Sequence, residues 1–322
     1  MASFALLALA LFTLQAGAQQ WKPARNVEIV APSGAGGGSD GIARLVQKLI
    51  QDHRLVEVPV AVVNRPGAGG AIAWGSLNQH QGDGHFVAIS TANLLTNYIT
   101  GKSALNYTDL TPIAQLFSES VAAAVRADSP IRDGKELLER LKSDASALSI
   151  AMGTTLANPN HIALALATRA AGGDARKLKA VVFPAAAQGM AALLGGHVEV
   201  VASPAYNLIP HMQAGRIRIL AVSAPRRLAG ALAGVPTWRE QGAEVVVDNM
   251  RGVVGPKALG AAQVSYWEAV LSRMIATEDW KAHLEKRVWI DSYTGAEGSG
   301  KALKAQYDQL RLGLSELGLA KN

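Results

Sequence analysis

The 322-residue chain contains no cysteine. Disulfide bonds, thiolate metal sites, cysteine nucleophiles and a lipid-modified N-terminal cysteine are therefore excluded. Aromatic residues make up only 5% of the chain, whereas glycine is abundant at 32 residues. A core of Val, Ile, Leu and Ala, with glycine loops between its elements, is typical of layered α/β folds. The length suits two domains of ordinary size.

Charge of one sign is not concentrated anywhere along the sequence. The formal net charge is +6, but the basic residues are scattered, and Arg226-Arg227 and Lys286-Arg287 are isolated pairs. We therefore expect no nucleic-acid partner, and the charge favours attraction of small anions. The seven histidines are too dispersed to indicate a metal site. We expect a monomer with no cofactor and no metal.

Long hydrophobic runs are absent except at the beginning of the chain. Residues 4–14 are apolar but too few to span a bilayer. Ala16-Gly17-Ala18 follows, and this A-x-A pattern predicts a signal peptide over residues 1–18, cleaved after Ala18. No Lys or Arg precedes the run, so only the N-terminal amine supplies positive charge. Export to the periplasm is the expectation.

Short apolar runs alternate with helical stretches through the rest of the chain. Strands are expected at 27–31, 58–63 and 86–90, and a second group at 121–125, 149–152, 180–183, 198–202 and 217–222. Helices fill the intervals, and the tail after Pro236 returns to an αβα pattern that ends in a helix over 301–317. This order predicts two α/β lobes, each a mostly parallel sheet flanked by helices. We assign 19–120 plus 237–322 to lobe 1 and 121–236 to lobe 2, with crossing strands forming a hinge.

A glycine-rich loop at residues 32–41 is the richest candidate for binding. It follows a strand and opens a helix, so its N–H groups and the positive end of the helix dipole favour an anion. We expect Ser39 or Asp40 to be the N-cap. Five glycines in ten residues exceed what a capped turn needs, although such a turn without a ligand is the alternative.

The same loop matches two enzyme patterns. Gly36-x-Gly38-x-x-Gly41 has the spacing of a dinucleotide fingerprint, but the second strand ends in Asn64 where that motif needs an acid. Gly37-x-Ser39-x-Gly41 has the spacing of a nucleophile elbow, but five residues separate it from its strand. An exported serine hydrolase that uses Ser39, with His161 or His211, is the alternative function. We otherwise expect no catalytic residues.

The second lobe carries a counterpart of the glycine loop at residues 153–161. Asn158 followed by Pro159 predicts an N-cap and first helical residue. Thr154 and Thr155 would supply hydroxyl groups, and His161 either packs in the first helical turn or contacts a ligand. Two opposed helix N-termini would hold an anion without a buried positive side chain.

The carboxyl ends of parallel strands gather at one edge, where ligands of open α/β sheets bind. The small-residue join at 181–188 and Ser203 at the end of another strand belong to this edge. The predicted ligand-binding residues are Ser33, Gly36, Gly37, Gly38, Ser39, Asp40, Thr91, Asn93, Thr154, Thr155, Asn158, His161, Ala185, Gln188 and Ser203.

Motifs through nearly the whole chain resemble the tripartite tricarboxylate transporter receptors, the Bordetella uptake gene family of periplasmic binding proteins. They include Ala31-Pro32 with Gly36-Gly37-Gly38-Ser39-Asp40, Val63-Asn64-Arg65-Pro66-Gly67-Ala68-Gly69-Gly70, Asn158-Pro159-Asn160-His161, Gly195-Gly196-His197-Val198-Glu199 and Val235-Pro236-Thr237.

The resemblance implies a two-lobed, type II-like periplasmic-binding-protein fold that closes on a small carboxylate held by both loops, partly through water. A di- or tricarboxylate, an aromatic carboxylate or an amino acid would be captured for uptake or sensing, with a membrane permease pair or a sensor domain as partner. Phe183-Pro184-Ala185 departs from the family's frequent Tyr-Lys-Gly, and Met250-Arg251 stands where Trp is common. Arg251 either pairs with a second carboxylate or has a surface or inter-domain role.

Overall fold

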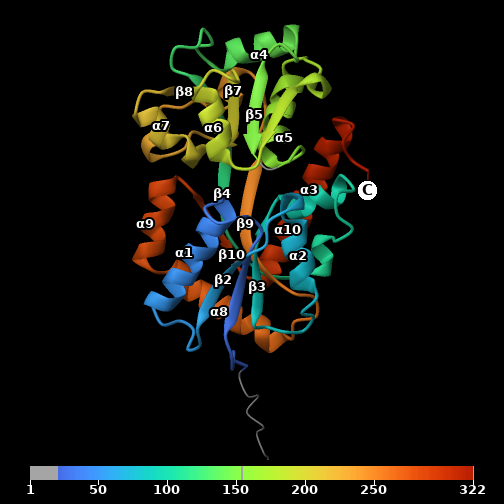
Figure 1. Ribbon diagram of the computed structural model, residues 1–322, viewed down its shortest axis with the longest axis vertical. Helices are drawn as coiled ribbons and strands as arrows, with labels where there is room; N and C mark the ends of the chain where they lie inside the picture. Colours follow the sequence, from blue (N-terminus) through green and yellow to red (C-terminus); the bar gives the residue numbers. More distant parts are fainter. Residues whose placement is uncertain (1–20, 154, 322) are drawn as a thin grey trace, which may run out of the picture.

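The computed structural model describes residues 21–153 and 155–321 as two α/β lobes stacked along the long axis (Figure 1). The predicted signal peptide and Thr154 lie outside the described residues. Lobe 1 holds the first and last parts of the chain, and lobe 2 holds the middle part, as the colours of Figure 1 show. The predicted two-lobed α/β class is confirmed.

The lobe 1 sheet combines a parallel flank with antiparallel strands. The first three strands pair in parallel in the order β2-β1-β3, and β9 then pairs antiparallel with both β3 and β4. The bounds are β1 Val27–Ala31, β2 Val60–Asn64, β3 Phe86–Thr91, β4 Thr111–Arg126, β9 Asp248–Gly255 and β10 Ile290–Thr294, the last antiparallel to β4.

The lobe 2 sheet is built on the second half of β4. There β4 pairs antiparallel with β7 and β8, and β5 lies parallel between β7 and β6. The bounds are β5 Ser149–Gly153, β6 Lys179–Phe183, β7 Val200–Pro204 and β8 Ile217–Val222.

A single long strand, β4, joins the two sheets and forms one crossing of the hinge. Its pairing with β9 ends at Ser120, and its pairing with β7 begins at Val121. The expected separate strand at 121–125 is therefore wrong in its start, because the strand continues without a turn from Thr111. The αβα pattern expected after Pro236 also missed a strand. In the structure β9 comes before the helices of the tail and returns the chain to lobe 1.

The assigned lobe boundaries stay a prediction. Residues between 237 and 247 pack with lobe 2: Trp238 shares a core with Val125, and Val247 N–H donates to the Ser223 carbonyl at 3.1 Å. These contacts favour placing the return crossing near Asp248 rather than at residue 237.

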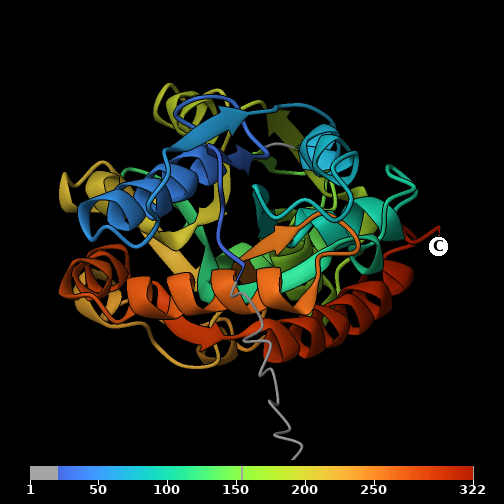
Figure 2. The same ribbon diagram turned by 90° about the horizontal axis from the view of Figure 1, so that it is seen from below.

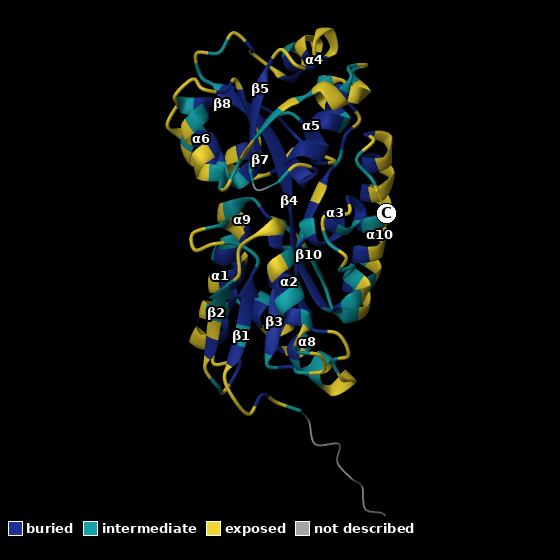
Figure 3. Ribbon diagram, turned by 45° about the vertical axis from the view of Figure 1, so that its right-hand side comes forward, coloured by how far each residue is buried: buried dark blue, intermediate teal, exposed yellow. Residues whose placement is uncertain are grey.

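Helices cover both faces of each sheet, and buried strands lie between exposed helical faces (Figure 3). The lobe 1 helices are α1 Gly38–Asp52, α2 Ala71–Asn78, α3 Asn93–Ile99, α8 Ala261–Ile275, α9 Glu278–Arg287 and α10 Ala296–Glu316. The lobe 2 helices are α4 Gly134–Ser143, α5 Pro159–Ala170, α6 Ala186–Leu194 and α7 Ile209–Gln213. Single 3₁₀ turns include η1 Ala68–Gly70 and η4 Ala205–Asn207. None of the described helices is both long enough and apolar enough to cross a membrane.

The last helix, α10, runs along one side of the molecule and reaches lobe 2 (Figures 1 and 2). Its Leu310 and Leu314 lie in one core with Ala163 and Ala167 of α5. Arg169 of α5 also forms an ion pair with Glu316 at 2.5 Å. Helix α10 of lobe 1 therefore forms a second connection to lobe 2, through α5.

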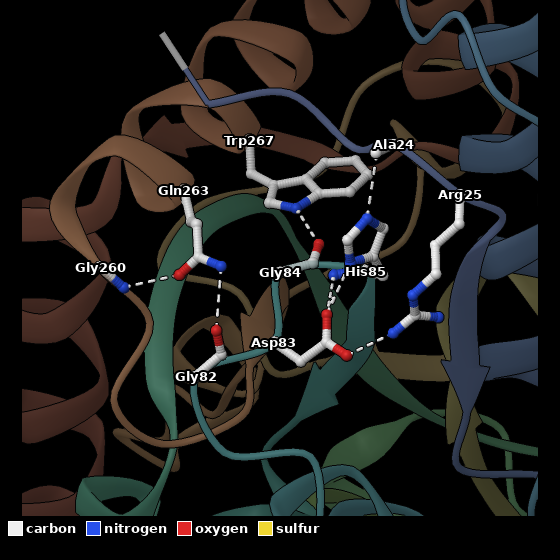
Figure 4. Close-up of polar contacts among 9 residues, drawn as sticks. All are labelled: Ala24, Arg25, Gly82, Asp83, Gly84, His85, Gly260, Gln263 and Trp267. Atoms are coloured by element: carbon white, nitrogen blue, oxygen red, sulfur yellow. Dashed lines mark hydrogen bonds and ion pairs between the residues drawn. The ribbon is translucent and has the colours of Figure 1, made fainter. Parts of the chain in front are cut away.

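The described chain begins at the end of lobe 1 that lies away from lobe 2 (Figure 1), and Figure 4 shows the polar contacts there. The Ala24 N–H donates to His85 Nε2 at 3.1 Å, and Arg25 pairs with Asp83 at 2.5 Å. Asp83 also contacts His85 Nδ1, and Trp267 Nε1 donates to the Gly84 carbonyl at 2.8 Å. These contacts fix the beginning of the described chain far from the seam between the lobes.

Candidate ligand-binding crevice

The two lobes meet where the carboxyl ends of their parallel strands face each other. A Cβ placed on Gly38 in lobe 1 would lie 3.5 Å from Tyr206 Oη in lobe 2. A Cβ on Gly69 in lobe 1 would lie 3.3 Å from Thr155 Cγ2 in lobe 2. Helices α1 and α5 begin close to these two places, so both helix N-termini lie at the seam between the lobes.

The N-cap at the end of the first loop is not the residue expected from the sequence. The N-cap of α1 is Gly37, and no side chain caps it, so the expectation of Ser39 or Asp40 as N-cap is wrong. The helix begins earlier because Ser33 Oγ accepts from the Asp40 N–H at 3.0 Å and takes over the capping role from outside the helix. The N–H groups of Gly38 and Ser39, in the first helical turn, have no intrahelical acceptor. They are the donors that this loop offers to an anion.

Asp40 holds the first loop in shape. Its buried carboxylate accepts from the Gly36 N–H at 2.9 Å, from Asn64 Nδ2 at 2.8 Å and from Arg44 Nε at 3.1 Å. Burial acts to raise the pKa of Asp40, but these hydrogen bonds outweigh it and lower the pKa below 3.8. Asp40 and Ser33 thus act on the backbone of the loop, and direct ligand contact by either remains a prediction.

We expect Asp40→Asn to lower the free energy of unfolding by about 2 kcal/mol, because charge-assisted hydrogen bonds at a buried carboxylate are lost. Urea unfolding at pH 7 measures this. The difference from wild type should shrink as the pH falls through the folded-state pKa of Asp40, since its carboxylate stabilises the fold only when ionised. A difference that stays constant down to pH 3 would contradict this role.

The second loop is pinned by Asn158. This N-cap residue accepts from the His161 N–H at 2.9 Å, and its Nδ2 donates to the Gly153 carbonyl. Pro159 is the first helical residue, so the predicted N-cap pair is confirmed. Among the described atoms of this loop, His161 Nδ1 accepts from the Ala157 N–H at 3.0 Å. His161 therefore supports its own loop from inside the fold.

The protonation of His161 should weaken this loop in mild acid. Burial, with a smaller contribution from Lys102, lowers the pKa of His161 below 6.5. The unfolded chain then binds a proton more readily, so stability is complete above pH 6.5 and is lost as the pH falls toward the folded pKa. We expect melting temperature and carboxylate affinity to decline from pH 7.5 to 5.5 more steeply in wild type than in His161→Asn, whose Oδ1 can still accept from Ala157. Equal slopes would contradict the role of His161.

A third loop, which the sequence analysis did not assign to the site, stands between the other two. Asn97 Nδ2 donates to the Ala68 carbonyl at 3.1 Å, and Asn93 Nδ2 donates to the Gly69 carbonyl at 3.3 Å. Gly70 has φ +100°, a conformation that L side chains rarely adopt, and a Cβ there would lie 3.0 Å from Pro32. The pattern of a strand, then glycines, then a helix is the signal that pointed to the first loop and would have found this one.

Two side chains cross the seam without having been predicted. Lys102 Nζ in lobe 1 lies 2.7 Å from both Thr155 Oγ1 and the Leu156 carbonyl in lobe 2. Tyr206 in lobe 2 belongs to the hydrophobic cores of both lobes, and Arg287 lies over its ring at 6.0 Å. Sequence patterns could not point to Lys102, because its partners lie more than fifty residues away.

The remaining predicted residues lie on the same edge. Thr91 Oγ1 accepts from the Asn93 N–H at 3.2 Å at the start of α3. Ala185 is the N-cap of α6, Gln188 is exposed in its first turn, and buried Ser203 ends β7. Their ligand contacts stay predictions, and that of Thr154 falls outside the described residues.

Arg251 is engaged within the protein. Its guanidinium forms a buried ion pair with Glu119, the side chains being 12% and 2% exposed. Both residues lie in the lobe 1 sheet, on β9 and β4 next to the hinge, and contact of Arg251 with a second carboxylate of a ligand stays a prediction.

Among the residues described, Ser39 is not paired with the histidine base that an elbow serine needs. In the described part of the chain, no hydrogen bond joins Ser39 to a histidine, and His161 Nδ1 is occupied by Ala157. The described residues also contain no group of three His, Cys, Asp or Glu side chains able to hold a metal.

Two α/β lobes, a crossing strand as hinge and two helix N-termini at the seam between the lobes are the architecture of a two-lobed solute-binding protein. Comparison with known proteins agrees: the model of the tripartite tricarboxylate transporter family receptors matches residues 42–287. This chain belongs to that family.

Individual relatives extend the match over most of the chain. A UPF0065 protein of Bordetella bronchiseptica is 29% identical over 77% of this chain and 72% of its own length. The UPF0065 protein in the gbd 5' region of Cupriavidus necator is 26% identical over 99% of this chain and 95% of its own length.

Solved structures share the architecture. A TctC solute-binding protein from Polaromonas is 26% identical, with a TM-score of 0.71 over 91% of this chain and 99% of that one. The periplasmic binding protein BugD, at 24% identity, superposes with a TM-score of 0.82 over 93% of this chain and all of that one.

Proposed function

We propose that this receptor captures a small carboxylate in the periplasm, closes on it, and performs no chemistry on it. The first and second loops grip the carboxylate from opposite lobes through backbone N–H groups and helix dipoles. The observation that carries the proposal is the convergence of the α1 and α5 N-termini on one seam, where Gly38 meets Tyr206 and Gly69 meets Thr155.

The electrostatics of the crevice support an anion. The partial positive charges of the two helix N-termini add, and they act in a site from which closure excludes water. Lys102 contributes a full positive charge beside Thr155. Proteins of similar fold support this chemistry, because one R. palustris protein was solved with bound malate and another with adipate. These two structures, at 22% and 21% identity, share the fold with this chain.

Closure of the lobes would also change the surface that the receptor presents to a partner. Cross-lobe contacts such as Lys102 with Leu156 exist only when the lobes approach, so the seam differs between open and closed forms. A membrane permease pair or a sensor domain that reads the closed form would respond to ligand. The mature chain would begin after Ala18 and act as a monomer.

A thermal-shift screen of mature protein against small organic acids tests the proposal. A ligand that binds only the folded state raises the melting temperature, by an amount that grows with its concentration over Kd. We expect at least one acid to stabilise the protein and its amide or ester to have no effect. Failure of every acid on a broad panel would overturn the proposal, as would turnover of an ester panel that Ser39→Ala abolishes.

A further inference from the structure

A buried ion pair lies at the hinge, where β4 and β9 run side by side. Glu119 on β4 is 2% exposed, and Arg251 on β9 is 12% exposed. Glu119 lies opposite Asn249 in the strand register, two residues before β4 passes into lobe 2. The pair therefore occupies the part of the fold that both lobes share.

All of the donors in this cluster converge on one oxygen of Glu119. Oε1 accepts from Arg251 Nε at 2.9 Å, from Arg251 Nη2, and from Asn249 Nδ2 at 2.7 Å. Oε2 is buried and has no hydrogen-bond partner among the described residues. Buried carboxylate oxygens are nearly always hydrogen-bonded, because leaving one bare costs its full desolvation penalty. Glu119 Oε2 is thus a strong hydrogen-bond acceptor without a donor among the described residues.

The unpaired acceptor is connected to the crevice through Tyr206. Burial first, and the neighbouring Glu119 carboxylate second, raise the pKa of Tyr206 to about 12. The same tyrosine places its Oη beside Gly38 in the first loop. Thr91, a predicted ligand residue, is the register partner of Arg251 on the adjacent strand. Glu119 is thus a neighbour of Tyr206, which meets the first loop at the seam between the lobes.

We propose that Glu119 Oε2 accepts a hydrogen bond from a hydroxyl or ammonium group of the ligand. This inference rests on the proposed function and narrows its ligand class to carboxylates that carry a hydrogen-bond donor on the chain. Arg251 neutralises Glu119, so the acceptor adds no net repulsion against the ligand's own carboxylate. Arg251 itself is a positioning residue, since its Nε and Nη2 are committed to Glu119.

Matched acids test the inference directly. Isothermal titration would measure Kd for three acids that share one carbon skeleton. They are a plain dicarboxylate, its derivative with one hydroxyl group and its derivative with one amino group. We expect wild type to bind at least one donor-bearing acid about 10–100-fold more tightly than the plain acid, the range for a hydrogen bond to a charged group. The derivative that binds more tightly identifies the donor as a hydroxyl or an ammonium group.

Glu119→Gln sharpens the test because it exchanges an acceptor for a donor. With Arg251 and Asn249 holding the amide oxygen, the Nε2 group would stand where Oε2 was. The preference should then fall to about onefold or reverse, while the plain acid keeps its affinity. Glu297→Gln, which removes an 84%-exposed carboxylate on α10, is the matched charge control and should bind like wild type.

The outcomes separate this inference from the function on which it rests. If plain acids bind wild type as tightly as donor-bearing acids, the role of Glu119 is overturned and the carboxylate receptor stands. A preference that survives Glu119→Gln overturns it as well, because the donor is then recognised elsewhere. If no acid binds wild type, the proposed function itself fails. Should Glu119→Gln fold poorly, equal binding of plain and donor-bearing acids by wild type still overturns the role of Glu119.

Discussion

Gly38→Asp should weaken the affinity for the carboxylate ligand by about 100-fold or more without destabilising the protein. Gly38 is the first residue of α1, is exposed to the crevice, and has a backbone conformation that any residue can adopt. An acid in the first turn of a helix stabilises it. The same carboxylate would occupy the N–H groups offered to the ligand and repel the ligand's charge, which costs several kcal/mol between like charges.

Two variants isolate the cause of that loss. Gly38→Asn adds nearly the same volume beside Tyr206 without the charge, so it should retain more affinity than Gly38→Asp. Ala261→Asp places an identical acid at the exposed first position of α8, outside the crevice, and should leave binding unchanged. Isothermal titration and thermal unfolding measure both quantities. Normal binding by Gly38→Asp would show that the first loop does not hold the anion.

Asn158→Ala should weaken ligand binding by about 10–100-fold, because the second loop loses both of its anchors. The substitution removes the acceptor for the His161 N–H and the donor to the Gly153 carbonyl. Loss of an N-cap costs about 1 kcal/mol in helix stability. The loss of affinity should exceed this cost, because a loosened loop must be ordered again whenever a ligand binds.

Asp133→Ala is the control for that prediction. Asp133 is the N-cap of α4 in the same lobe, and its side chain accepts from the Glu136 N–H at 2.9 Å, outside the crevice. It should lower the melting temperature to a similar extent while leaving Kd within about twofold of wild type. If both N-cap variants change affinity equally, the effect of Asn158 is one of general stability.

The sequence predicted those features whose signals are local. Asn158-Pro159 specified the start of α5 because cap and first-turn preferences depend on adjacent residues. Strand Val27–Ala31 and the strand–glycine–helix order of the first loop were likewise encoded within a few residues. The function class followed from the number and order of family motifs.

Features that depend on distant pairing could not be predicted in the same way. Glu119 and Arg251 are 132 residues apart, and only the register of β4 with β9 brings them together. The continuity of β4 across both lobes was hidden because one strand serves two sheets. Capping of α1 by Ser33 from outside the helix displaced the expected N-cap, since its hydroxyl reaches Asp40 across seven residues.

A crystal structure of the protein saturated with its tightest-binding acid tests the central claim most directly. We expect the ligand's carboxylate oxygens to lie about 2.7–3.2 Å from N–H groups of Gly38 or Ser39 and of the loop at residues 155–158, or to be joined to them by one water. A carboxylate bound to one lobe alone, or held by a positive side chain away from both helix N-termini, would contradict it.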